Sequence, residues 1–144
     1  MSPNILVGFD DSDASRRALE FALDRAQARR EGVLIAHVLE WSPYSFLTPE
    51  EIEQRHSRRS DEMLRAENAL LKPMLERYAD SGVSMTTTMK YGHVAEILCR
   101  LAKTEDISLI MIGRTGHSGL SSRLFGSVAG ALAQSSPVPV TIVP

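Results

Sequence analysis

The sequence predicts a three-layer α/β fold, a Rossmann- or flavodoxin-like sandwich in which a mainly parallel sheet carries helices on both faces. Short apolar runs of strand length recur along the chain, and segments with the apolar spacing of helices separate them. Gly, Pro, Ser and Asp residues mark the boundaries between these segments. Because strands that alternate with helices need crossover connections, this order predicts a parallel sheet that is covered on both faces.

The first part of the chain reads as a strand, a helix and a strand. Ile5 to Phe9 is a short apolar run followed by Asp and Ser residues, which predicts a buried strand leading into a helix capped by Ser12 or Asp13. Alanines then recur every four residues and give this helix one apolar face. We expect Gly32 to end the helix as its C′ residue, and Val33 to Leu39 to form the second strand.

The middle of the chain is more polar and carries strong helix signals. Residues 41–47 read as an aromatic loop, and Thr-Pro-Glu-Glu at 48–51 combines an N-cap, a first-turn proline and a capping box. Pro73 is expected to kink or break the helix that follows. From Val83 to Lys90 apolar and polar residues alternate, which predicts a strand with one exposed face at an edge of the sheet.

The last part of the chain repeats the alternation of helix and strand. Helical spacing marks Val94 to Ala102, and Ile107 to Ile112 reads as a buried strand. A short helix is expected over Ser127 to Gln134, and a final strand over Pro139 to Val143. Since no repeat, low-complexity segment or long linker divides the sequence, we expect one domain over residues 1–144.

Composition and charge argue against several classes of protein. The chain has 16 Lys and Arg against 18 Asp and Glu, so no global basic field is present to attract nucleic acid. The single cysteine, Cys99, excludes an internal disulfide framework and agrees with a reducing compartment. The sequence shows neither a signal-peptide pattern nor an apolar run near the length that crosses a bilayer. We therefore expect a cytoplasmic protein that is not embedded in a membrane.

The glycine-rich segment that follows the fourth predicted strand has the chemistry of an anion site. It begins at Gly113 and leads directly into the helix at Ser127. Glycines let the backbone approach a phosphate, successive N–H groups form a concave donor set, and a helix start adds partial positive charge. The segment is not a Walker loop, because the Gly-Lys-Ser/Thr ending is missing. Composition alone leaves an ordinary loop as an equal alternative.

The spacing of the glycines resembles a family signature. Gly113, two residues, Gly116, nine residues and then Gly126-Ser127 is similar to the Gly-x2-Gly-x9-Gly-Ser/Thr pattern of ATP-binding members of the universal stress protein family. Other segments resemble the family in the same order along the chain: 5–12, 36–40, 92–98 and 137–140. The resemblance implies a five-stranded sheet in the order 3-2-1-4-5, with Asp10 and Gly113 on either side of one cleft.

The resemblance also implies which residues hold a nucleotide. Asp10 would contact the adenosine, and the backbone of Val38 would bind the adenine edge. The loop amides and polar side chains would hold ribose and phosphates through Gly113, Arg114, Gly116, His117, Ser118, Gly126, Ser127 and Val128. The ligand implied is ATP, with Mg²⁺ or Mn²⁺ held mainly by the phosphates. One departure is His93-Val94, where the family often has Asp or Asn and then Pro, and it puts the local turn in question.

Other candidates read as structural. Asp10 and Asp11 could form a metal or acid–base pair, but carboxylates before a helix are more often caps, so Asp11 is assigned to capping. His37 lies inside an apolar strand and is expected to be a hydrogen-bonded core histidine. No His and Cys spacing matches a metal site, so we expect no metal ion held by the protein alone.

Three functions remain open at this point. The first is an ATP-dependent regulatory module for stress survival, or for a client such as a transporter or kinase, and it would dimerise through Val140 to Val143 as the resemblance implies. The second is a slow ATP hydrolase or nucleotidyl-transfer enzyme, for which Asp10 and His117 are the only visible bases. The third is a dimeric interaction protein without ATP, which the glycine signature disfavours.

Overall fold

The structure is a computed structural model that describes residues 3–40, 48–116 and 127–144. The chain divides into two compact units, Met1–Glu40 with Ser81–Pro144 and Trp41–Asp80. Whether they behave as one domain over residues 1–144 stays a prediction.

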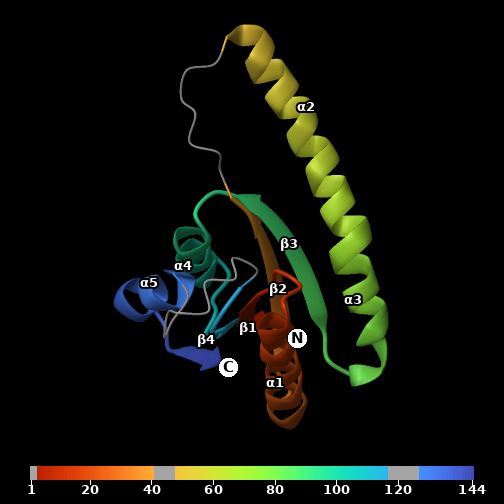
Figure 1. The fold of residues 1–144 in the computed structure, drawn as a ribbon. Helices are drawn as coiled ribbons and strands as arrows, with labels where there is room; N and C mark the ends of the chain where they lie inside the picture. Colours follow the sequence, from red (N-terminus) through yellow and green to blue (C-terminus); the bar gives the residue numbers. More distant parts are fainter. Residues whose placement is uncertain (1–2, 41–47, 117–126) are drawn as a thin grey trace. The chain divides into compact units, whose positions relative to one another are not determined.

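The larger unit contains a five-stranded parallel sheet, as predicted (Figure 1). Its strands are β1 (Pro3–Gly8), β2 (Gly32–Leu39), β3 (Met85–Tyr91), β4 (Leu109–Gly113) and β5 (Val140–Val143). They lie in the order β3-β2-β1-β4-β5, and every neighbouring pair is parallel. The chain therefore moves outward from β1 to β3 and then returns to the other side of β1. The strand order reverses between β1 and β4, where open α/β sheets bind ligands.

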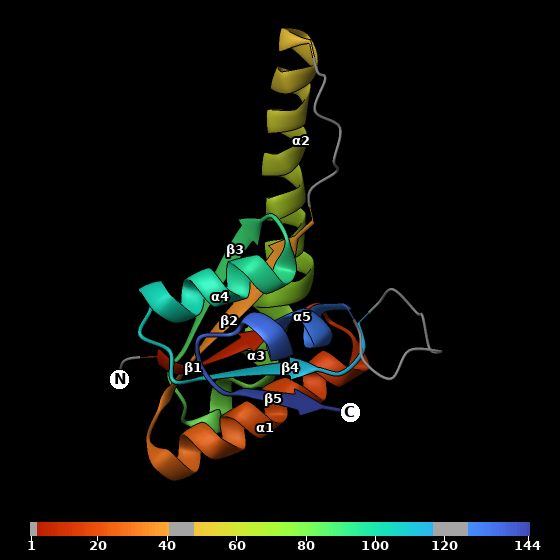
Figure 2. The same cartoon turned by 90° about the vertical axis from the view of Figure 1, so that its left-hand side faces the viewer.

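Helices cover both faces of this sheet, which confirms the three-layer prediction. In Figures 1 and 2, α1 (Asp13–Arg29) lies on one face, and α4 (Val94–Thr104) and α5 (Ser127–Ser135) lie on the other. Successive strand residues point to opposite faces, so the strands bury side chains on both. The layer between the strands and α4 and α5 is built from these buried residues: Leu6, Leu34, Ala36, Ile97, Leu98, Leu101, Ala102, Ile107, Ile110, Ile112, Ala129 and Leu132.

The two ends of α1 differ in how well the sequence predicts them. Ser12 is the N-cap, and its side chain accepts a hydrogen bond from the backbone N–H of Ser15. The expected C′ role of Gly32 is wrong. Arg30 takes the left-handed conformation with φ 56°, and its N–H donates to the carbonyl of Ala26. Gly32 is already the first residue of β2, where it pairs with Pro3.

The smaller unit is helical. α2 (Pro49–Ala66) begins with the predicted capping box between Thr48 and Glu51. It continues through a π-helical segment, η1 (Glu67–Leu71), into α3 (Lys72–Arg77) and a 3-10 turn, η2 (Ala79–Ser81), that leads back to the larger unit. Pro73 lies in the first turn of α3, where its missing N–H is tolerated. The expected disruption is therefore a local change of helix type, with no break in the helical path.

The predicted edge strand is confirmed as β3, which lies at one end of the strand order. It begins at Met85, two residues after the expected start at Val83. No β3 residue is fully buried, so both of its faces are less covered than those of β1. None of the described helices combines the length and the hydrophobicity that a membrane-spanning helix needs.

Candidate functional site

A cavity of about 330 Å³ lies beyond the carboxyl ends of the strands at the point where the strand order reverses. It is lined by the ends of β1, β2 and β4, the turns after them, and parts of α1, α4 and α5: Gly8, Phe9, Asp10, Ser12, Ser15, Ala36, Val38, Glu40, Val94, Leu98, Ile112, Gly113, Arg114, Thr115, Gly116, Ser127, Val128 and Ala129. Seven of the ten predicted site residues are among them. The other three, His117, Ser118 and Gly126, lie outside the described residues.

The inner part of the cavity is apolar, and its wall contains a glycine. A Cβ atom on Gly8 would lie 3.2 Å from side-chain carbons of both Leu98 and Ile112. Gly8 therefore lets the end of β1 pack closely against these two side chains, and all three residues line the cavity. Apolar walls with a few polar groups are typical of small-molecule sites.

The polar edge of the cavity comes from β2, which extends beyond the end of β1. The backbone hydrogen bonds of Val33 and Leu39 run toward β3. The carbonyl of Ala36 faces β1 instead, where it accepts from Phe9 N–H at 2.9 Å. Because backbone groups alternate along a strand, Val38 turns its N–H and C=O toward β1. The β1–β2 pairing ends at Gly8 and Ala36. Within the described residues, Val38 therefore presents an unpaired donor and acceptor to the cavity.

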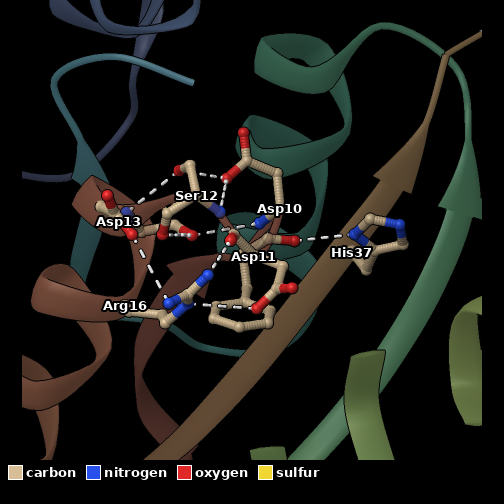
Figure 3. Close-up of polar contacts among 8 residues, drawn as sticks. Asp10, Asp11, Ser12, Asp13, Arg16 and His37 are labelled. Carbon is tan, nitrogen blue, oxygen red and sulfur yellow. Dashed lines mark hydrogen bonds and ion pairs between the residues drawn. The ribbon is translucent and has the colours of Figure 1, made fainter. Parts of the chain in front are cut away.

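Asp10 is held in place by the turn that joins β1 to α1. One carboxylate oxygen, Oδ1, accepts hydrogen bonds from the N–H of Ser12 at 3.0 Å and from the Ser12 hydroxyl (Figure 3). The Ser15 hydroxyl lies 3.4 Å from the Asp10 N–H and donates to the Ser12 carbonyl at 3.0 Å. The carboxylate is thus oriented before any ligand arrives.

The assignment of Asp11 to helix capping is wrong. Its backbone has φ 62°, a conformation that Asp adopts more readily than most residues, and its side chain points to Arg16 (Figure 3). Arg16 donates from Nε to the Asp11 carboxylate at 3.2 Å and from Nη2 to the Asp11 carbonyl at 2.8 Å. Capping belongs to Ser12, and Asp11 instead fixes the left-handed turn that aims Asp10 at the cavity.

The structure favours glycine at the first two glycine positions of the predicted loop for different reasons. A Cβ on Gly113 would lie 2.7 Å from both the carbonyl carbon and the Cβ of Ala14, because α1 starts directly against the end of β4. A Cβ on Gly116 would lie 2.7 Å from Oδ2 of Asp10. Gly113 thus allows β4 and α1 to pack, and Gly116 brings the loop backbone against the Asp10 carboxylate.

Not every predicted amide donor is available. The N–H of Arg114 donates to the carbonyl of Val143 at 2.7 Å, so it extends the β4–β5 pairing and is not directed at a ligand. On the other side of the cavity, Ser127 and Val128 form the first turn of α5. A helix start offers unpaired N–H groups and partial positive charge to an anion.

His37 and His93 both have structural positions in the described residues. His37 is buried and hydrogen-bonded, as expected, with Nδ1 2.8 Å from the Phe9 carbonyl oxygen. His93 is the N-cap of α4 but makes no side-chain capping bond. The turn before α4 is therefore present, although His93-Val94 departs from the family's usual residues there. Among the residues described, no three His, Cys, Asp or Glu side chains gather as a metal site.

Sequence reasoning missed three lining residues that bear on the site, namely Gly8, Ser15 and Glu40. Glu40 follows the end of β2, so its position after a predicted strand was an available signal. Ser15 carried no such signal, since its contact with the Asp10 turn depends on how α1 begins.

Comparison with known proteins identifies the family. The model of the universal stress protein family matches residues 1–144. The chain is 30% identical over 156 residues to the universal stress protein YxiE of Bacillus subtilis, covering 99% of each protein. The structure of the universal stress protein UspA from Lactobacillus plantarum superposes with a TM-score of 0.86 at 26% identity, covering 99% of this chain and 98% of that one.

A universal stress protein solved in complex with cAMP has the same fold, with a TM-score of 0.69 at 24% identity, covering 99% of this chain and 96% of that one. The strand order, the placement of the cavity and these matches along the full chain agree. The chain belongs to the universal stress protein family.

Proposed function

We propose that this protein binds ATP in the cavity between β1 and β4 and acts as a nucleotide-dependent regulatory module. One observation carries the proposal. The unpaired backbone of Val38, the oriented carboxylate of Asp10 and the start of α5 all border the same cavity. These three features suit the base, the sugar and the phosphates of a nucleotide in turn.

The backbone of Val38 suits adenine in particular. Its N–H and C=O lie side by side on a strand edge, and adenine carries a ring-nitrogen acceptor next to an amino donor. A base held there would lie against the apolar wall to which Gly8, Leu98 and Ile112 contribute. Guanine presents a carbonyl in place of the amino group, so the Val38 carbonyl would face another acceptor. We therefore expect ATP to bind more tightly than GTP.

The polar groups around the base would hold the rest of the ligand. Asp10 would accept a hydrogen bond from the ribose, and the first turn of α5 at Ser127 and Val128 would receive phosphate oxygens. Gly113, Arg114 and Gly116 would border the ribose and phosphates, as would His117, Ser118 and Gly126. Mg²⁺ or Mn²⁺ would be held mainly by the phosphates.

The cAMP complex supports the proposal at the level of the fold, because another protein with this architecture holds an adenine nucleotide. Regulation in the cytoplasm is the role that we propose. ATP occupancy would change the loop after β4, and a client protein such as a transporter or kinase would read that change. The protein would act as a homodimer through Val140–Val143, since β5 pairs with β4 on one side and lies last in the strand order.

Calorimetric titration with Mg-ATP tests the site. We expect about one ATP per chain, and about tenfold or greater loss of affinity in Asp10→Asn, because a charge-assisted hydrogen bond is lost. This variant keeps an acceptor oxygen for Ser12, so the turn should survive. Asp13→Asn is the matched control: it removes a carboxylate from the same helix start, but the Asp13 side chain is 81% exposed and outside the cavity.

The outcomes separate the candidate functions. Absence of ATP binding by the parent protein would remove the proposal and leave an interaction protein with the family fold. Turnover of many ATP molecules per minute, abolished by Asp10→Asn, would replace the regulatory role with an enzymatic one.

A further inference from the structure

His37 makes a contact that determines where the β1–β2 pairing stops. Its side chain is 8% exposed, and its Nδ1 lies 2.8 Å from the carbonyl oxygen of Phe9 (Figure 3). A carbonyl oxygen only accepts hydrogen bonds, so Nδ1 must carry the proton. The Nδ1–H therefore donates to Phe9, whether the ring is neutral or protonated.

The Phe9 carbonyl is also the next acceptor in the ladder between β1 and β2. Phe9 N–H donates to Ala36, and in a regular parallel pair the following bond would run from Val38 N–H to the Phe9 carbonyl. Within the described residues that bond is not made, and the pairing ends at Gly8 and Ala36. The Phe9 carbonyl instead accepts from the imidazole of His37, which turns one of its two lone pairs away from Val38.

We propose that His37 is a positioning residue for the nucleotide site: by binding the Phe9 carbonyl, it ends the β1–β2 ladder and keeps the Val38 N–H open for a ligand acceptor. The inference rests on the proposed function only for the ligand, an adenine nucleotide. His37 is not among the residues that line the cavity, but its side chain binds the Phe9 carbonyl, and Phe9 does line it. It acts through its neighbours on both strands.

The contact also anchors the turn that carries Asp10. Phe9 is followed directly by Asp10; its N–H donates to Ala36, and its C=O, which belongs to the peptide that joins Phe9 to Asp10, accepts from His37. Loss of the imidazole donor would release this carbonyl and let the Phe9–Asp10 peptide rotate toward Val38. A donor at the position of Nδ1 thus affects the base-binding backbone and the sugar-binding carboxylate together.

Two variants of His37 isolate the donor. His37→Phe keeps an aromatic ring but has no hydrogen-bond donor, whereas His37→Asn keeps an N–H at the position of Nδ1. We expect the amide hydrogen of Val38, followed by NMR in the ligand-free protein, to exchange rapidly in the parent and in His37→Asn. In His37→Phe it should exchange at least about tenfold more slowly, because Val38 then bonds to Phe9.

Affinity for Mg-ATP should follow the same pattern. We expect about a tenfold loss in His37→Phe, equivalent to one hydrogen bond, and recovery to within about threefold of the parent in His37→Asn. Urea unfolding of each variant shows that it folds. A Val38 amide that exchanges equally fast in all three proteins would overturn the inference, as would equal ATP affinity in the presence of slowed exchange.

The failure of the proposed function has a different signature. If the parent does not bind ATP while Val38 exchange still responds to His37→Phe, the nucleotide proposal fails and the positioning role of His37 stands.

Discussion

Gly113 is the position where a single added methyl group should have the largest effect. In Gly113→Ala the new Cβ would start 2.7 Å from two carbons of Ala14 and 2.8 Å from the Ser15 nitrogen, against an ordinary contact of 3.4–4 Å. The end of β4 or the start of α1 must therefore move by at least 3.4 − 2.7 = 0.7 Å. Most of these atoms are backbone, so no rotamer change relieves the contact. Overpacking of this kind costs about 1–3 kcal/mol.

Urea unfolding measures this cost, and Gly130→Ala is its matched control. Among the described residues, a Cβ at Gly130, inside α5, would meet no atom within 4 Å apart from the backbone of its own helix and its chain neighbours. Alanine is favoured over glycine in a helix by about 1 kcal/mol, so the control should raise the free energy of unfolding. The two substitutions are chemically identical and should have opposite signs. Equal or greater stability of Gly113→Ala would refute the reasoning.

The same contact has a practical meaning for binding studies. A larger residue at Gly113 would displace the start of α1, which carries Ser12 and the turn of Asp10. Loss of ATP binding in such a variant would thus reflect a moved turn as much as a blocked loop. Asp10→Asn is the cleaner probe of the site.

Further substitutions give smaller effects. Gly116→Ala places a Cβ 2.7 Å from Oδ2 of Asp10 and should displace the carboxylate. Calorimetry should then show about fivefold weaker binding of Mg-ATP. Unchanged affinity would mean that ATP binding does not depend on the present position of this carboxylate. His93→Ser supplies the side-chain capping bond that His93 does not make and, with Glu96, completes a capping box at the start of α4. Thermal unfolding should show a rise of about 0.5–1 kcal/mol in the free energy of unfolding. No rise would count against the described helix start. Asp11→Ala should lower the free energy of unfolding in urea by about 1–2 kcal/mol, because it places alanine in a left-handed conformation and removes a half-exposed ion pair to Arg16. Asp11→Gly should lower it less, because glycine adopts a φ of 62° without strain. A larger loss in Asp11→Gly than in Asp11→Ala would contradict the role of this φ.

Periodicity was sufficient to predict the alternation of helices and strands, because it depends on local patterns, whereas the strand order and the site residues came from the family resemblance. The end of α1 was not predictable in this way. Gly32 is the better left-handed residue by sequence, but its pairing with Pro3 makes it part of β2, and Arg30 takes the turn instead. Tertiary pairing overrode a local preference.

The role of Asp11 was missed for a related reason, since it depends on the contacts of Arg16 with the Asp11 side chain and carbonyl. His37 was correctly predicted as a hydrogen-bonded core residue, but its partner, the Phe9 carbonyl, was not. Arg114 is a similar case, since its amide belongs to the β4–β5 pairing. Sequence spacing can place a residue near a site, but competition for individual hydrogen-bond partners becomes visible only in three dimensions.

The bond from Arg114 N–H to Val143 joins the start of the glycine loop to the strand proposed as the dimer contact. A ligand that shifts this amide and a partner that binds the outer edge of β5 would therefore both affect the hydrogen bonds between β4 and β5. Such coupling is reciprocal: whatever factor nucleotide adds to the association constant of the dimer, dimerisation adds to the affinity for nucleotide. ATP affinity that depends on protein concentration would then be a direct measure of how strongly assembly and occupancy communicate.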